Sequence, residues 1–589
     1  MTSTLPRPEP RRFGPAGRPC FGWLHLPGPD APRSAIGLVI CGPFGHEALC
    51  AHRSLRHFAA AAADSAVPAL RFDYDGTGDS AGDDRDPDRW NAWIGSVHHA
   101  VDELRTSTGV RRVCLLGIRL GATLATLAAS DRDDVAGLIA IAPVVAGAAW
   151  LRELKALQLI LGLADPPPAV AVEQGLQESA GFIITSETRQ AIAAVSLLGI
   201  ASPPAPEVML LDREDFPPNA RWVEQLTKVG ARVDHRRMPG YAEMVLDPHD
   251  AVVPEGMIRA VAEWLRQRAA EIPVVALAPV PLASPPVRLL IAPGVEETAD
   301  YLDETRTLFG IVTAPSGVER PSRAIVLLNA GAVYHVGPNR LHVRLARLWA
   351  ARGYLVLRLD IAGIGDSPPW PGEAENVVYS AFAVSDIAIA LACLRDRWGI
   401  SGACALGLCS GAYHAFKSAV AGLPLSGVVI INPLVFFWKP GMSLAYPAHK
   451  VAEAAEQYRR SAFQLQKWKK LLSGKVDVGA LMQVGARHTA SLAAGWFRNI
   501  ARTLGRPVPD DLGTELDAVV RRGIALRFVF VSGDPGDELL RVQAGSALRR
   551  LLRRQLVQIR RIEGPDHTFT PVWSHDVLIA TLEAALEIG

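Results

Sequence analysis

Short runs of Val, Ile and Leu alternate along the chain with helix-length segments that are Ala-rich or amphipathic. Apolar runs such as residues 37–41 and 112–116 are too continuous for strands that expose one face, and segments such as 54–64 and 340–353 separate them. Apolar strands joined by helices indicate a mainly parallel sheet that helices cover on both faces. The pattern therefore predicts an α/β fold, with reactive groups at the carboxyl ends of the strands.

The pattern occurs twice. Four landmarks in the first half return in the same order in the second half, at offsets of 287 to 290 residues. Two copies at a near-constant offset indicate duplicated domains rather than a solenoid. The landmark pairs are Phe21 and Phe309, Gly42 and Gly331, Asp73 and Asp360, and Gly117 and Gly407.

The chain is too long for one hydrophobic core, since its 589 residues exceed the roughly 250 to 300 at which single cores stop growing. Between the copies lies EIPVVALAPVPLASPPVR, whose five prolines favour an extended, stiff linker. We expect two tandem domains, 1–270 and 289–589, joined by the linker 271–288. Each sheet should carry a helical cap insertion, which in the second domain covers about 435–520.

Each copy contains a strand, a sharp turn and a helix. In each turn one glycine lies two residues before the central residue and another lies two residues after it. In ACALGLCSGAYHA the turn is Gly407, Cys409 and Gly411, whereas VCLLGIRLGATLA holds Arg119 at the central position. Small flanking residues permit a strained turn that exposes the central side chain. Cys409 is therefore a candidate nucleophile, while a guanidinium cannot lose its proton and Arg119 cannot attack.

These turns, with FDYDGTGDS, PGYAEMVLDPHD, NAGAVYHVGPNRLHV and GPDHTFTP, resemble the α/β-hydrolases. More narrowly, the chain resembles serine aminopeptidase S33-like hydrolases, including two types that accompany bacterial exosortase loci. The resemblance implies a triad in the chain order nucleophile, acid, histidine. His567 follows the last strand, and Asp534 or Asp537 follows the strand before it. Spacing favours Asp534, directly after the strand, without excluding Asp537.

The same fold analogy assigns the oxyanion donors of the second domain. They would be the backbone N–H of Ser410, directly after the nucleophile, and one from the loop that holds Gly331 and Ala332. Side-chain identity matters little for this role. Small residues matter because they let the substrate approach.

In the first domain, the residues at the positions of the nucleophile, the acid and the histidine have all changed. Aligning MPGYAEMVLDP with IEGPDHTFTP places Glu243 where the histidine should be, and Asp215, or else Asp212, is a remnant acid. Arg119 and Glu243 should then form an ion pair that closes a dead pocket, because either charge buried alone costs several kcal/mol. We expect a non-catalytic scaffold.

Composition sets further bounds. Lys plus Arg number 61 and Asp plus Glu 60, so nothing in the net charge of +1 points to nucleic acid or an anionic membrane. Seven cysteines without close pairs argue against disulfides and a zinc site, and favour the cytoplasm. We expect no metal, no cofactor, no signal peptide and no membrane span. The longest uncharged run, 418–438, is broken by two prolines.

Several other chemically suggestive residues have structural interpretations. His335 and His414 could line the pocket but are expected to pack or hydrogen-bond, and the two Gly-Asp-Ser sequences, at Asp79 and Asp366, are expected to form turns. Basic residues interleaved with aromatics at 456–475 suit a cap helix. Alternatively, they could recognise an anionic group, such as the phosphate of a pantetheine arm or an acidic carrier protein.

Cysteine in place of serine favours thioester chemistry, because a thiolate attacks well at neutral pH. We expect an acyltransferase or thioesterase-like hydrolase that forms an acyl-enzyme on Cys409 from an ester or thioester, including one bound to coenzyme A or a carrier protein. A plain ester or amide hydrolase is an alternative. A chain that has lost turnover and binds an acyl carrier or partner protein is another.

Overall fold

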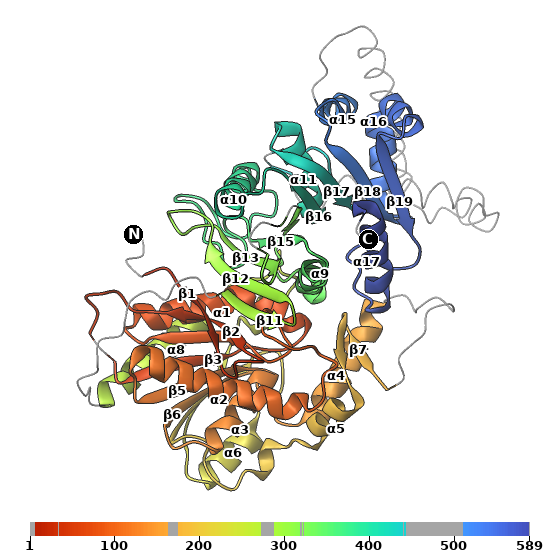
Figure 1. Ribbon diagram of the computed structural model, residues 1–589. Helices are drawn as coiled ribbons and strands as arrows, with labels where there is room; N and C mark the ends of the chain where they lie inside the picture. The colour runs from red at the N-terminus through yellow and green to blue at the C-terminus, as the bar shows by residue number, and fades with distance from the viewer. Residues whose placement is uncertain are drawn as a thin grey trace, which may run out of the picture. The chain divides into compact units, whose positions relative to one another are not determined.

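The computed structural model describes residues 6–32, 34–162, 175–272, 288–318, 321, 323–439, 441–442 and 510–587. Two large sheets dominate these residues, one in each half of the sequence (Figure 1). Below, the first repeat is the half that contains β1 to β10, and the second repeat is the half that contains β11 to β19. The predicted fold class, sheets that are mostly parallel and flanked by helices, is confirmed. Most of the predicted linker 271–288 and most of the predicted cap at about 435–520 lie outside the described residues.

The first sheet has the strand order β1-β2-β4-β3-β5-β6-β9-β10. β1 and β2 are antiparallel to their neighbours, and every pairing from β4 to β10 is parallel. Its strands are β1 (Glu9–Phe13), β2 (Cys20–His25), β3 (Ile36–Cys41), β4 (Ala69–Asp73), β5 (Arg112–Ile118), β6 (Val135–Ile141), β9 (Glu207–Arg213) and β10 (Arg232–Met238). A separate hairpin pairs β7 (Gln177–Ser179) with β8 (Phe182–Ile184).

Helices bury both faces of this sheet. One core layer contains side chains of α2, α3 and α6, and the other contains side chains of α1 and α8. β3 is fully buried, which explains its unbroken apolar sequence. The helices are α1 (His46–Asp64), α2 (Arg89–Thr108), α3 (Leu120–Ser130), α4 (Gly147–Leu161), α5 (Ser186–Ala194), α6 (Ala220–Lys228), α7 (Tyr241–Met244) and α8 (Glu255–Glu271), with a 3-10 turn at Leu197–Gly199.

The second sheet repeats this order. It runs β11-β12-β13-β15-β14-β16-β17-β18-β19, so the seven strands from β13 to β19 follow the order of β2 to β10 in the first sheet. The additional pair β11 and β12 extends its antiparallel edge. The strands are β11 (Arg288–Ala292), β12 (Val295–Tyr301), β13 (Phe309–Pro315), β14 (Ala324–Leu328), β15 (Leu355–Leu359), β16 (Ala403–Leu408), β17 (Leu425–Ile431), β18 (Ala525–Val531) and β19 (Val557–Ile562).

The described helices of the second repeat follow its strands in the same way. β16 leads directly into α11, and β18 leads into α16. These helices are α9 (Leu341–Ala350), preceded by a 3-10 turn at Pro338–Arg340, α10 (Ala383–Trp398), α11 (Ser410–Ala421), α15 (Leu512–Arg521), α16 (Pro535–Arg553) and α17 (Trp573–Leu586). Within the described ranges, no helix is both long enough and apolar enough to cross a bilayer.

The backbone forms two compact units whose limits differ from those of the repeats. One unit contains residues 1–319, 332–377 and 570–575, and the other contains 320–331, 378–569 and 576–589. The edge of the second sheet at β11, β12, β13 and β15 therefore belongs with the first repeat, while the strands around Cys409 belong to the other unit.

Candidate active site

Cys409 lies in a strained turn between β16 and α11. Its φ is +58°, a left-handed conformation that non-glycine residues rarely adopt. The turn is tight, since a Cβ on Gly407 would lie 2.0 Å from the carbonyl carbon of Gly411. Cys409 directly precedes the first residue of α11, where helix N–H groups favour a negative charge. The sequence prediction of a sharp turn here agrees with this geometry.

His567 and Asp534 are hydrogen-bonded. The Nδ1 atom of His567 lies 2.7 Å from Oδ2 of Asp534, whose side chain is 2 % exposed. Asp534 caps α16 and accepts a second hydrogen bond, 2.8 Å long, from the N–H of Gly536. Asp537, the other acid left open by the spacing, pairs with Arg541 and Arg561 instead. Geometry therefore selects Asp534 as the partner of His567.

The thiol of Cys409 lies near the ring of His567. The Nε2 atom of His567 is buried and has no hydrogen-bond partner among the described residues, while Cys409 lies close enough to raise the pKa of the ring. Burial lowers the pKa of His567, but the hydrogen bond with Asp534 and the proximity of Cys409 outweigh it and raise the pKa to about 10. An imidazole whose pKa is raised in this way can take a proton from a neighbouring thiol and hold it.

Asn432 holds the histidine loop, and sequence reasoning did not identify it. Its Nδ2 donates to the carbonyl of His567 at 2.7 Å, and its Oδ1 accepts from the N–H of Val531 at 2.9 Å. Asn432 also has a positive φ of +44°. At the repeat offset of 290, Asn432 corresponds to Ala142 of the first repeat. This difference, an amide side chain in one copy and a methyl group in the other, could have drawn attention to Asn432.

An aromatic cluster lies beside the thiol. Tyr379 stacks on Trp438 with ring centroids 4.3 Å apart, and it meets Tyr413 edge-on at 5.3 Å. Burial, together with the nearby Cys409 and Tyr413, raises the pKa of Tyr379, so its hydroxyl stays protonated. That hydroxyl has no hydrogen-bond partner among the described residues. Sequence reasoning did not place Tyr379 near Cys409.

The expected oxyanion donors are only partly free. The N–H of Gly331 donates to the hydroxyl of Ser410 at 2.9 Å, which ties the loop after β14 to the turn at Cys409. Gly331 is therefore engaged by a side chain. The backbone N–H of Ser410, at the first position of α11, remains a candidate, whereas Ala332 belongs to the other compact unit.

The first repeat has the same turn with different chemistry. Arg119 has a φ of +55°, and its N–H donates to Ile141 as that of Cys409 donates to Ile431, both at 3.0 Å. The Nε of Arg119 lies 3.1 Å from Oε1 of Glu47, and its Nη2 pairs with Glu153.

The expected ion pair between Arg119 and Glu243 is wrong. Glu243 is exposed on α7, and the two carboxylates of Glu47 and Glu153 neutralise Arg119 instead. Their charges outweigh the effect of burial and raise the pKa of Arg119. The two remnant acids of the first repeat have other partners as well. Asp215 is exposed and pairs with Arg213, and a carboxylate oxygen of Asp212 lies 2.8 Å from Nε2 of His235.

The histidines set aside on sequence grounds have structural partners. The Nε2 atom of His414 lies 2.9 Å from the carbonyl oxygen of Val378, and burial lowers the pKa of His414 to about 4.

The Gly-Asp-Ser turns are alike in the two repeats. The N–H of Asp79 donates to the carboxylate of Asp73, and the N–H of Asp366 donates to the carboxylate of Asp360, both at 2.9 Å.

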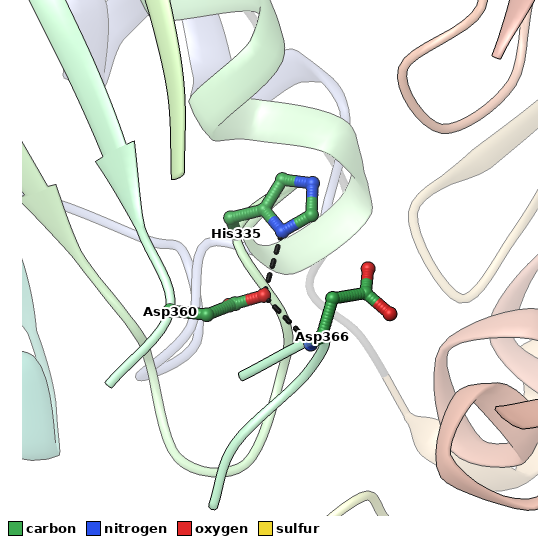
Figure 2. Close-up of side chains that lie close together, drawn as sticks. All are labelled: His335, Asp360 and Asp366. Carbon is green, nitrogen blue, oxygen red and sulfur yellow. Dashed lines mark hydrogen bonds and ion pairs between the residues drawn. The ribbon is translucent and has the colours of Figure 1, made fainter. Parts of the chain in front are cut away.

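Residues with metal-ligand chemistry meet at one point. Potential ligand atoms of His335, Asp360 and Asp366 lie within 4.8 Å of one another (Figure 2). His335 uses both ring nitrogens, however, at 2.7 Å from Asp360 and 2.6 Å from Asp79. These carboxylates overcome the effect of burial and raise the pKa of His335 to about 10. A doubly hydrogen-bonded imidazolium has no lone pair for a metal, so the cluster is one of paired charges.

Comparisons with known proteins agree with the resemblance at the level of the fold. Residues 49–192, in the first repeat, match the family model of serine aminopeptidase S33. No curated protein matches the chain in sequence. The resemblance to α/β-hydrolases inferred from the motifs is confirmed to this extent.

Solved structures are similar to about half of the chain. Est1E from Butyrivibrio proteoclasticus is 17 % identical with a TM-score of 0.33, and covers 44 % of this chain and 99 % of its own. A proline iminopeptidase from Mycobacterium smegmatis is 15 % identical with a TM-score of 0.31, and covers 45 % of this chain and 99 % of its own. The α/β hydrolase GrgF from Penicillium sp. sh18 is 17 % identical with a TM-score of 0.32, and covers 45 % of this chain and all of its own.

Proposed function

We propose that the second repeat is an acyl-transferring enzyme that forms a covalent acyl-enzyme on Cys409. The donor is a thioester or an ester, and a thioester of coenzyme A or of a carrier protein is the donor class that suits a thiol nucleophile best. Acyl exchange between two sulfurs changes bond energy little, so such a donor can load the enzyme readily.

The observation that carries the proposal is the arrangement of His567. Asp534 fixes one ring nitrogen at 2.7 Å, and the other nitrogen has no partner among the described residues except the nearby thiol. An oriented histidine between a buried carboxylate and a thiol in a strained turn can accept and return a proton. A purely structural hydrogen bond between His567 and Asp534 would not explain why the buried Nε2 atom of His567 is left without a hydrogen bond.

The reaction follows from these positions. His567 Nε2 takes the thiol proton, and the thiolate of Cys409 attacks the acyl carbonyl carbon. The N–H of Ser410 donates to the oxyanion, and collapse of the intermediate breaks the bond to the leaving thiol or alcohol, which receives the proton from His567. The acceptor then repeats the sequence in reverse: it loses its proton to His567 and takes the acyl group from sulfur.

The second candidate is hydrolysis, with water as the acceptor. The match of residues 49–192 to a peptidase family model favours this outcome, since the repeats share their strand order and their turn. The same acyl-enzyme precedes both reactions. We place the enzyme in the cytoplasm, because all seven cysteines are free and a reducing compartment keeps them so.

Intact-mass spectrometry after incubation with short and long acyl thioesters tests the proposal. The parent should gain the mass of one acyl group, and the Cys409→Ala variant should gain none. Release of the adduct by an amine or an alcohol faster than by water supports transfer, and release by water alone supports hydrolysis. Absence of an adduct and of turnover with every donor would overturn the enzyme and leave the partner-binding alternative.

A further inference from the structure

A cavity of about 300 Å³ lies beside Arg119; the first repeat supplies most of its lining, and residues 334–340 supply the rest. This volume lies at the lower end of the range for small-molecule sites. The lining is mainly apolar and includes Leu49, Leu154, Phe182 and Ile184, with a charged group formed by Glu47, Arg119 and Glu153. Further polar lining residues include His52, Asp73, Asp84, Asn339 and Arg340. The cavity lies above the turn that corresponds to the turn at Cys409, yet no nucleophile occupies that turn.

Around Arg119, the carboxylates outnumber the guanidinium. Two carboxylates, of Glu47 and Glu153, face the single guanidinium of Arg119. His46 also lines the cavity, but Asp247 lies 3.5 Å from it and balances its charge. Among the described residues, Glu153 pairs with Arg119 through Oε2 only, and its side chain is 47 % exposed. A carboxylate oxygen of Glu153 therefore remains available to a donor that enters the cavity.

Aromatic rings form part of the wall. Phe44 lies at centroid distances of 4.5 Å from both Tyr74 and Trp93, and Trp150 lines the same cavity. The faces of such rings attract cations, most strongly where water is excluded. Aromatic walls next to surplus carboxylates are a combination that recognises ammonium groups.

We propose that this cavity binds a protonated apolar amine, with the ammonium at Glu153 and the hydrocarbon part along the aromatic and aliphatic wall. The inference goes beyond the proposed function, since it concerns the repeat without a nucleophile. A carboxylate ligand would need to displace Glu153 from Arg119, at the cost of leaving a carboxylate unpaired. The other guanidinium in the lining, that of Arg340, already donates to four backbone carbonyls. An alcohol would fit the wall but would lack the charge.

Isothermal titration calorimetry with n-octylamine, octan-1-ol and octanoate tests this assignment, since the probes share a chain and differ in head group. The protein is the full chain with Cys409→Ala, which removes reaction at the other repeat. We expect octylamine to bind at least about tenfold more tightly than either other probe. Equal or tighter binding of octanoate, or no binding of octylamine, would overturn the proposal.

Two variants locate the site. Glu153→Gln should weaken octylamine binding about tenfold, because it replaces a charged acceptor with a neutral one. Ala48→Phe, which adds a ring to the cavity wall, should abolish binding. Glu255→Gln, an exposed carboxylate outside the cavity, is the matched control and should change nothing. Octylamine binding that survives both Glu153→Gln and Ala48→Phe would show that the amine binds elsewhere.

Discussion

Arg71 of the first repeat donates to the carboxylate of Asp366 of the second, with Nη2 and Oδ1 2.5 Å apart. The reciprocal pair also forms, since Arg358 donates to Asp79. Both arginines and both aspartates occupy matching positions, 287 residues apart. The two copies therefore exchange equivalent ion pairs, as the subunits of a symmetric dimer do.

Removing one of these charges should destabilise the fold. Asp366 is buried and pairs with both Arg71 and His52, which lowers the pKa of Asp366 despite its burial. Asp366→Asn leaves the buried guanidinium without its counter-charge, and we expect a loss of about 3 kcal/mol in the free energy of unfolding by urea. Asp133→Asn, an exposed control, should stay within about 0.5 kcal/mol of the parent. Equal stability of the two variants would contradict the role of the exchanged pairs.

His335 should make stability depend on pH. Its pKa is raised from 6.5 to about 10 by Asp360 and Asp79, so its contribution is complete below about pH 6.5 and disappears as the pH rises through 10. The gap in unfolding free energy between the parent and His335→Gln should therefore shrink by roughly 2 kcal/mol or more between pH 6 and pH 10. His249→Gln, at an exposed histidine, should follow the parent. A gap that stays constant with pH would argue that His335 is neutral in the fold.

The two candidate acids should differ in their effect on the thiol. Asp534→Asn removes the carboxylate that orients His567 and should slow acylation of Cys409 by about 100-fold or more. Asp537→Asn removes only surface pairs with Arg541 and Arg561, so the rate should stay within about threefold. Stopped-flow measurement of acylation by a chromogenic thioester compares them. A larger loss in Asp537→Asn would reverse the assignment.

Asn432 should act through the position of His567. Asn432→Ala removes the donor that holds the carbonyl of His567, and we expect acylation to fall about tenfold. The pH at which the rate is half-maximal should shift as well, since the imidazole would move from Asp534. Asn91→Ala, at an exposed asparagine of the first repeat, is the control. An unchanged rate and pH profile would restrict Asn432 to a purely structural role.

Arg119 should matter for stability and not for turnover. Arg119→Ala leaves Glu47 and Glu153 without their cation, so we expect a loss of about 2 kcal/mol or more in the unfolding free energy. Acylation of Cys409 should be unchanged. Loss of acylation in a variant that remains folded would show that the first repeat takes part in the chemistry.

The sequence predicted the α/β class, the mainly parallel sheets and the two turns because these features depend on local patterns. Apolar runs mark the buried strands, and glycines mark the turns at Cys409 and Arg119. The partners of Arg119 could not be predicted in this way. Glu47 and Glu153 come from α1 and α4, and only the folded chain brings them to the turn, whereas alignment pointed to Glu243. The ion pairs of Arg71 and Arg358 could not be predicted either, because a local sequence pattern does not show whether the partner aspartate comes from the same copy or from the other.

Selective alkylation tests the central claim, that His567 and Asp534 activate Cys409. Cys409 is half-buried and the other six cysteines are buried, so peptide mapping after a short exposure to iodoacetamide distinguishes them. We predict that Cys409 is alkylated first and that His567→Gln slows its alkylation by about tenfold or more. Alkylation of Cys409 at the same rate in parent and His567→Gln would contradict the account.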